Sequence, residues 1–223
     1  MSKKNFSKLV YYLRLAFKKP KLILSFIFKK HLGVILSMPI QVVENSKSEK
    51  NFNIVNSKSK KKIYLFYKRM NRSAVNYEVI GEWLDKGFEC FLVQSSEEQA
   101  VGAMWIFKDE FFLNSLSGRT LSTKKKIKLD SNTIYGAYVI IDEKYRGRGI
   151  NQLLLTYVIN YYSKKSVYKN LLLITGASNG AYIRTMMKHG AKLIGITEVI
   201  NIFGFKKRRE IFLDRKEKMW NLE

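Results

Sequence analysis

The chain has 223 residues, of which 46% are hydrophobic and 13% aromatic, so it can bury one sizeable core. Its 41 Lys and Arg residues outnumber 18 Asp and Glu residues, and the resulting net charge of +23 favours an anionic partner. A single cysteine, Cys90, excludes an intramolecular disulfide and a cysteine metal cluster; it fits a reducing, cytoplasmic compartment and is expected in the core.

Basic residues dominate the start of the chain. Residues 1–43 contain nine Lys or Arg and no acidic residue, the first carboxylate being Glu44. If residues 6–19 form a helix, with 100° of rotation per residue, four cations fall in one arc of its surface: Lys8, Arg14, Lys18 and Lys19. Apolar side chains and tyrosines then occupy most of the remaining surface. The pattern predicts a basic amphipathic helical extension over residues 1–44.

The apolar run in this extension is too short for a membrane span, because only seven residues, 22–28, separate two lysines and a span needs about 20. The segment also lacks the small-residue cleavage site of a signal peptide. Two interpretations stay open: helices that cover part of the core, or a peripheral anchor at the inner face of an anionic membrane. The polar, lysine-rich residues 45–61 predict a linker, and the catalytic domain is expected over residues 62–223.

Alternation and turn signals predict the elements of this domain. Its first half is expected to contain a strand at 62–68, a helix at 73–87, a hairpin of strands at 88–94 and 100–107, and a basic loop at 122–132. Ser73 would cap the helix and Gly87 would end it.

The second half alternates between the two element types. It is expected to contain a strand at 134–141, a helix at 151–163, a strand at 171–175, a helix at 179–189, and strands at 192–203 and 209–214. This order predicts an α/β (α+β) fold with a mixed, largely antiparallel twisted sheet flanked by helices.

The turn between the strand at 134–141 and the next helix is rich in glycine and arginine. Gly147 and Gly149 allow backbone conformations closed to other residues, and they let a ligand approach the main chain. The amides of residues 148–151 would then lie at a helix N-terminus, where phosphate binds favourably. Arg146 and Arg148 add positive charge. The turn predicts a pyrophosphate site, with a simple tight helix start as the alternative.

Two common nucleotide motifs are absent from this turn. A dinucleotide fingerprint would need a third glycine at Gln152 and an acidic residue at the end of the next strand. A P-loop would need a Gly-Lys-Ser/Thr ending, which is also missing.

The turn instead resembles the acyl-CoA site of the GNAT acetyltransferase superfamily. Residues 141–151, IDEKYRGRGIN, are similar to the family's strand ending followed by Arg-Gly-x-Gly-x-Gly/Ala. The family's second motif, an Asn followed nine residues later by Lys and eleven later by Gly, is met by Asn179, Lys188 and Gly190. The resemblance covers residues 62–215 and implies acetyl-CoA, or another acyl-CoA, as co-substrate, bound around Arg146, Gly147, Arg148, Gly149, Ile150, Asn151 and Asn179.

The chain departs from the family pattern at three positions. Asn151 stands where the family prefers Gly or Ala, and Ala191 where it usually has Phe. Met186 occupies the position of the tyrosine that protonates the leaving thiolate in the family. Tyr182, one turn earlier, is the substitute acid, although a packing role is the simpler interpretation.

The resemblance also implies that the main chain of Val139 and Ile141 holds the pantetheine and the thioester oxygen. A general base has no clear counterpart. Tyr138, or a water chain to Glu110 or Asp130, is the candidate, whereas His189 more simply favours the helix dipole.

We expect an N-acetyltransferase that acts on a primary amine, such as an amino sugar of a surface-glycan precursor at the membrane face. The alternatives are an N-acyltransferase that uses an acidic acyl carrier protein as donor, or a non-catalytic module that binds anionic lipid or nucleic acid. Nucleic acid is the less favoured ligand because no recognised binding motif interleaves aromatic residues with the basic patches. No metal is expected, and a homodimer is left open.

Overall fold

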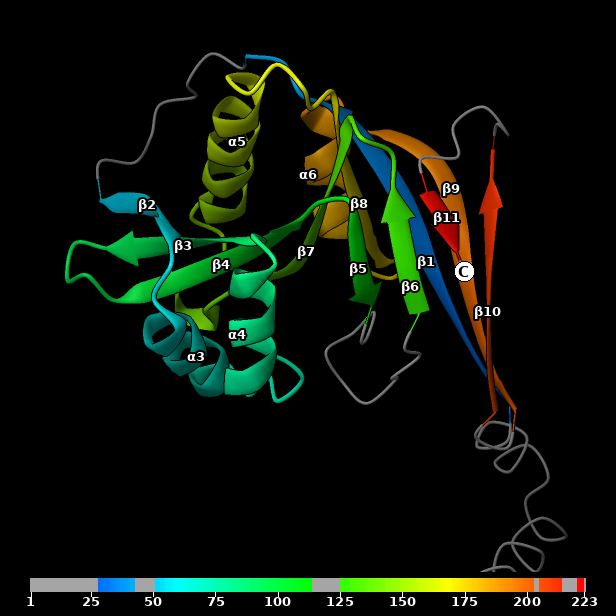
Figure 1. The fold of residues 1–223 in the computed structure, drawn as a ribbon, viewed down its shortest axis with the longest axis horizontal. Coiled ribbons are helices and arrows are strands. Elements are labelled where there is room, and N and C mark those ends of the chain that lie inside the picture. Colours follow the sequence, from blue (N-terminus) through cyan, green and yellow to red (C-terminus); the bar gives the residue numbers. More distant parts are fainter. Residues whose placement is uncertain (1–27, 43–50, 114–124, 203–204, 214–219, 223) are drawn as a thin grey trace, which may run out of the picture.

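The computed structural model describes residues 28–42, 51–113, 125–202, 205–213 and 220–222 (Figure 1). Eight strands form one large sheet in the order β10-β9-β1-β8-β7-β4-β3-β2. Neighbouring strands are antiparallel except for β7 and β8, which are parallel. The predicted mixed, largely antiparallel sheet is therefore confirmed.

The elements have the following bounds. The strands of the large sheet are β1 Phe28–Pro39, β2 Phe52–Ser57, β3 Glu89–Ser95, β4 Ala100–Phe107, β7 Thr133–Ile141, β8 Asn170–Gly176, β9 Lys192–Ile202 and β10 Phe205–Phe212. The helices are α3 Lys60–Arg69, α4 Tyr77–Asp85, α5 Ile150–Ser163 and α6 Gly180–Lys188, with a short 3-10 turn at Glu143–Tyr145. A second sheet, in the order β11-β6-β5, consists of β5 Glu110–Leu113, β6 Lys125–Leu129 and β11 Trp220–Leu222.

The helices lie in two layers, with α3 and α4 on one side of the large sheet and α5 and α6 on the other (Figure 1). Each layer encloses its own core because successive side chains of a strand point to opposite faces. On β3, Cys90 and Leu92 pack with the α3 and α4 side, whereas Phe91 and Val93 pack with the α5 side. Cys90 is fully buried, as expected of a core cysteine.

The first described strand, β1, corrects the expectation of helices over the whole of residues 1–44. It lies inside the large sheet, antiparallel to β8 on one edge and to β9 on the other. Its residues Ile35, Leu36 and Met38 are at most 1% exposed. A strand covered on both faces has a continuous apolar run, and periodicity cannot distinguish such a run from a helix. Residues 1–27 lie outside the described part.

Four further expectations differ from the structure. Part of the expected linker at 45–61 is the edge strand β2, and part of the expected basic loop at 122–132 is β6. The expected strand at 62–68 lies in helix α3, which is capped by Ser59 and buries Ile63, Phe66 and Tyr67 at helical spacing. Helix α4 is capped by Asn76 rather than Ser73. No helix in the described part of the chain is long and apolar enough to cross a membrane.

Candidate active site

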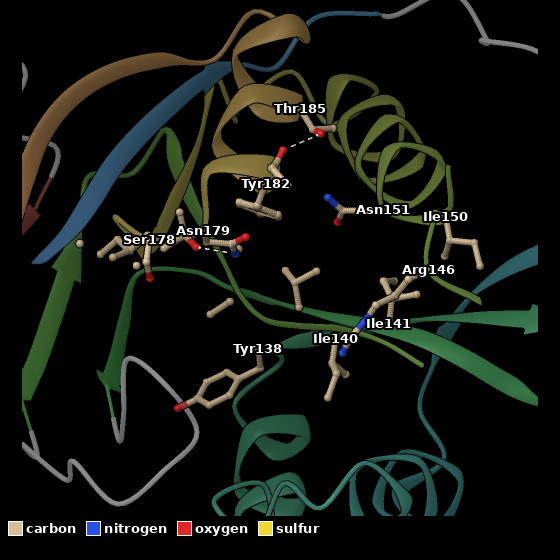
Figure 2. Close-up of a pocket in the computed structure, with 18 of the residues that line it drawn as sticks. Tyr138, Ile140, Ile141, Arg146, Ile150, Asn151, Ser178, Asn179, Tyr182 and Thr185 are labelled. Atoms are coloured by element: carbon tan, nitrogen blue, oxygen red, sulfur yellow. Dashed lines mark hydrogen bonds between the residues drawn. The ribbon is translucent and has the colours of Figure 1, made fainter. Parts of the chain in front are cut away.

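A cleft of about 1020 Å³ opens where β7 and β8 separate (Figure 2). The two strands pair only from Thr133–Asn170 to Gly136–Leu173, although β7 continues to Ile141 and β8 to Gly176. Residues of both strands line the cleft beyond this point, together with the N-terminal turns of α5 and α6. The separation therefore exposes main-chain groups in the middle of the sheet to a ligand.

The Gly-rich turn forms one wall of the cleft. Gly147 has φ of 78° and Gly149 has φ of 70°, in the left-handed region that favours glycine. A β-carbon added at either position would meet no atom within 4 Å, so the main chain there faces open space. These two glycines are needed for backbone conformation and for the close approach of a ligand, rather than for packing.

Helix α5 begins directly after this turn, and its first backbone amides have no hydrogen-bond acceptor within the helix. No side chain caps its N-terminus, and the first helical backbone bond runs from the Leu153 amide to the Gly149 carbonyl at 3.0 Å. The amides of Ile150, Asn151 and Gln152 therefore lack an intrahelical acceptor, as in every helix start, and all three residues line the cleft. Donors of this kind, with the helix dipole behind them, bind phosphate groups. The residues present fit a pyrophosphate.

The two arginines of the turn have different surroundings. Arg146 lines the cleft, and its guanidinium lies 3.1 Å from the carboxylate of Glu143. Arg148 is not among the residues that line the cleft, and its guanidinium lies 5.3 Å from the centre of the Tyr145 ring. The arginine that contributes positive charge to the cleft is thus Arg146, while Arg148 is exposed and lies over the Tyr145 ring.

Strand β7 carries a bulge at the point where it leaves β8. Ala103 and Trp105 of β4 pair with Ile140 and Ala137 of β7, so β7 has one residue more than its partner here. Tyr138 lies within the bulge and has φ of 51°. Val139 and Ile141, which were predicted to hold the pantetheine, both line the cleft beside it.

A buried hydroxyl from helix α3 contacts the bulge. The Tyr67 hydroxyl donates a 2.7 Å hydrogen bond to the Tyr138 carbonyl. The Tyr138 ring packs 4.9 Å from Trp83 in the aromatic core, and Figure 2 shows it directed away from Tyr182 and Asn151. This orientation gives Tyr138 a packing role, and a role as base stays a prediction.

Helix α6 forms the opposite wall. The Asn179 side chain donates a 3.2 Å hydrogen bond to the Thr175 hydroxyl at the end of β8, so it ties the start of the helix to the strand. Tyr182 lines the cleft one turn later (Figure 2). Burial raises the pKa of its hydroxyl, which keeps the phenol protonated at neutral pH. Met186 is fully buried and packs in the core.

Apart from Tyr138, the described candidate bases are not among the residues that line the cleft. Asp130 is exposed and does not line the cleft, and the Glu110 side chain lies outside the described part. The His189 ring nitrogen Nδ1 lies 2.7 Å from the Thr185 carbonyl, at the end of α6. No cluster of His, Cys, Asp or Glu in the described ranges could hold a metal ion.

Several residues of the cleft did not emerge from the sequence, among them three with charged or titratable side chains. His31 lies on β1, Tyr67 on α3 and Arg72 after α3, and all three line the cleft. His31 lies in the segment that was predicted as a helical extension, Tyr67 in the expected strand at 62–68, and Arg72 between that strand and the expected helix at 73–87. The helical spacing of Ile63, Phe66 and Tyr67 was the signal that could have indicated a helix there.

A mixed sheet with a splayed parallel strand pair and an uncapped helix N-terminus beside the gap has the geometry of a site for a phosphate-bearing ligand. Residues 60–191 match the family model described as "Acetyltransferase (GNAT) family". This match covers more than half of the chain, and the chain belongs to the GNAT acetyltransferase family. Among curated proteins, none matches the chain.

Solved structures share the fold at low sequence identity. A GCN5-related N-acetyltransferase from Sphaerobacter thermophilus has a TM-score of 0.55 and 15% identity over 90% of this chain and 56% of its own. A glucosamine N-acetyltransferase region of a fungal multi-domain GH3 β-N-acetylglucosaminidase has a TM-score of 0.55 and 11% identity; the match covers 83% of this chain and 23% of that protein. A Drosophila protein has a TM-score of 0.51 and 11% identity; the match covers 86% of this chain and 58% of that protein. The chain thus spans less than two thirds of the length of each of them.

Proposed function

We propose that the protein is an N-acetyltransferase that transfers an acetyl group from acetyl-CoA to a primary amine. The observation that carries this proposal is the cleft between β7 and β8, with the uncapped start of α5 on its wall and a bulged strand across it. The amides of Ile150 to Gln152 and the Arg146 guanidinium would bind the pyrophosphate of CoA. The main chain of Val139 and Ile141 would hold the pantetheine arm.

The chemistry needs alignment more than a reactive side chain. The ammonium form of the acceptor first loses one proton to solvent, and the neutral amine nitrogen then attacks the thioester carbon. The carbon–sulfur bond breaks, the nitrogen gives up a second proton to solvent, and the thiolate of CoA takes up one proton and leaves as a thiol. Holding the two reactants in line can supply roughly 7–11 kcal/mol of the barrier. Tyr182 would protonate the departing sulfur, because its phenol lines the cleft, and it would then regain a proton from solvent. Burial raises the pKa of this phenol, which keeps it protonated before the reaction and also makes it a weak acid.

We infer that the acceptor class is an amino sugar, with a surface-glycan precursor as the first candidate. The description of the fungal region as a glucosamine N-acetyltransferase supports this choice. An acyl carrier protein as donor is the second candidate, favoured by the net charge of +23, because such carriers are acidic.

The test combines a donor assay with a matched pair of variants. The purified chain should release free CoA from acetyl-CoA when a suitable amine is added, and acetyl-CoA should raise its unfolding temperature. Gly149→Asp should lose that temperature shift, because a carboxylate would then face the phosphates. Gly149→Asn is the control: it has the same shape and tolerates positive φ, but carries no charge.

We expect Gly149→Asp to weaken acetyl-CoA binding at least about tenfold more than Gly149→Asn does. Equal binding by the two variants would reject the pyrophosphate site at this turn. If the wild-type chain binds anionic lipid or nucleic acid but neither acetyl-CoA nor an acylated carrier protein, the non-catalytic alternative replaces the proposal.

A further inference from the structure

The lining of the cleft also includes residues that belong to none of the motifs. Those on β1, β9, the bulge of β7, α3 and the connection after α3 are here called the acceptor end: His31, Tyr67, Arg72, Val75, Tyr138 and Val199. They come from β1, from α3 and the connection to α4, and from β7 and β9. The inference made from it rests on the proposed function, because it concerns the amine that would meet the thioester there.

The backbone around Arg72 is fixed by hydrogen bonds. Its amide donates to the Tyr67 carbonyl at 3.0 Å, and its carbonyl accepts from the Val75 amide at 3.0 Å. Its guanidinium is close enough to the Tyr67 hydroxyl to act on it: burial raises the pKa of Tyr67, and the charge of Arg72 opposes that rise. The same hydroxyl donates to the Tyr138 carbonyl at 2.7 Å. The charge of Arg72 therefore acts close to the bulge.

The described residues that line the cleft include two arginines and a histidine but no Asp or Glu. His31 contributes an imidazole at the acceptor end, and an imidazole offers at least one N–H donor in either charge state. A cleft lined by one sign of charge focuses the field of the whole molecule, which here has a net charge of +23. Such a cleft attracts anions and repels cations.

A primary amine in water is a cation at neutral pH. An acceptor with further positive charge, such as a polyamine, would be repelled from this cleft. We propose that the acceptor is an amine that also carries an anionic group, a carboxylate or a phosphate, which Arg72 binds while the amine faces the β7 bulge.

The test uses acceptors that differ only in the anionic group. Glucosamine 6-phosphate is compared with glucosamine, alanine with alaninamide, and spermidine serves as the polycation. The first pair reports on a phosphate and the second on a carboxylate. For at least one pair we expect kcat/KM to be about tenfold or more higher for the anionic member, mainly through KM, and we expect the preference to shrink with added salt.

Variants then locate the source of the preference. Arg72→Gln should bring the ratio of kcat/KM between the two members of the pair close to one, and Arg72→Lys should restore part of it. Lys61→Gln is the matched control: it removes the same charge from an exposed position of α3 outside the cleft, and should leave the ratio unchanged. Acetyl-CoA binding is measured for each variant to verify that the proposed acetyl-CoA site at the Gly-rich turn is intact.

Two results would overturn the inference. The first is a kcat/KM for glucosamine, alaninamide or spermidine that equals or exceeds the values for the anionic acceptors. The second is the same ratio of kcat/KM between the members of a pair in Arg72→Gln as in Lys61→Gln. If no amine is acetylated, the proposed function fails, and calorimetry decides the anionic site separately. Binding of glucosamine 6-phosphate or alanine that requires Arg72 would support the site, and equal binding by wild type and Arg72→Gln would reject it.

Discussion

Tyr67 is the residue that connects the α3 layer to the main chain of the cleft. Its ring is 1% exposed, and its hydroxyl bonds to the carbonyl of the residue with positive φ in the β7 bulge. Because a buried hydroxyl rarely lacks a partner, this bond both satisfies Tyr67 and restrains the strand segment on which the thioester would lie. Tyr67 is thus a positioning residue.

Tyr67→Phe removes that restraint and leaves the ring in place. A typical hydrogen bond contributes about 0.5–1.5 kcal/mol, so we expect kcat to fall by up to about tenfold. Acetyl-CoA binding should change less, because the amides of α5 remain in place. The control is Tyr64→Phe, on the same helix but outside the cleft. Equal kcat values in the two variants would remove Tyr67 from this role.

At the scale of an element, β1 shows how a strand from outside the matched residues 60–191 completes both the sheet and the cleft. It fills the position between β8 and β9 and contributes His31 to the acceptor end. The sheet would otherwise have two long unpaired edges in its interior, which invite aggregation.

Two truncations test the place of β1. A chain that starts at residue 43 loses Ile35, Leu36 and Met38 from the two cores, and each buried aliphatic side chain contributes about 1.5–3 kcal/mol. We expect this chain to aggregate or to unfold well below the temperature of a chain that starts at residue 28. Calorimetry or a dye-based unfolding curve measures the difference, and equal unfolding temperatures would contradict the position of β1.

Glu89 joins several elements at the far end of α5. Its carboxylate lies 2.7 Å from the Lys108 ammonium and 3.5 Å from that of Lys165. It also accepts hydrogen bonds from Tyr161 at 2.8 Å, from Tyr162, and from the Asn56 amide at 2.9 Å. Strands β2 and β3 and helix α5 meet at this one 5%-exposed residue.

Acid should weaken this junction. Burial alone would raise the pKa of Glu89, but the hydrogen bonds from Lys108, Tyr162 and Tyr161 and the charge of Lys108 outweigh it and lower the pKa from 4.5 to about 2. A lowered folded-state pKa stabilises the fold above the unfolded value near 4.5, and this stabilisation is lost as the pH falls towards 2. Its size is roughly 3 kcal/mol at most.

The measurement is the unfolding temperature between pH 5 and pH 2 for wild type and Glu89→Gln. Wild type should lose stability over this range more steeply than the variant, because Gln has no proton to bind. Parallel curves would show that Glu89 is not the group responsible.

Local features of the chain could be predicted, and distant ones could not. The turn at Gly147 and Gly149 depends on backbone conformation and on a helix start within a few residues, so the sequence motif was sufficient. The place of β1 depends on pairing with strands that come more than 130 residues later, which no local pattern records. Arg72 follows helix α3, whose short apolar run IYLFY is as compatible with a strand as with a helix. The sequence therefore offered no basis for placing Arg72 at the cleft.

At the scale of the whole molecule, the net charge of +23 is large enough to act on any anionic surface. Since β1 belongs to the sheet, the part of the N-terminal segment that could act as a membrane anchor is limited to residues 1–27. We propose that these residues attach the protein to the inner face of an anionic membrane, where each cation can contribute about 1 kcal/mol.

A liposome flotation assay tests this attachment. The full chain should float with anionic vesicles, less so in high salt, and not with neutral ones. The chain that starts at residue 28 is the comparison, because it keeps β1 and the cleft. Equal flotation of the two chains would move the attachment to the basic segment at 122–132, and binding to neutral vesicles alone would reject an electrostatic anchor.

The position of β1 also governs when the protein can complete its fold during synthesis. Gly33 pairs with Gly176 and Thr197, so the first strand that the structure describes finds its partners only after more than 130 further residues have been synthesised. At about 5–20 residues per second, it must wait roughly 10 s for β8 to emerge. During that interval an apolar strand is present without a partner, and pairing at such long separation is itself slow. The nascent chain is therefore expected to depend on chaperones that shield this first strand until the last ones arrive.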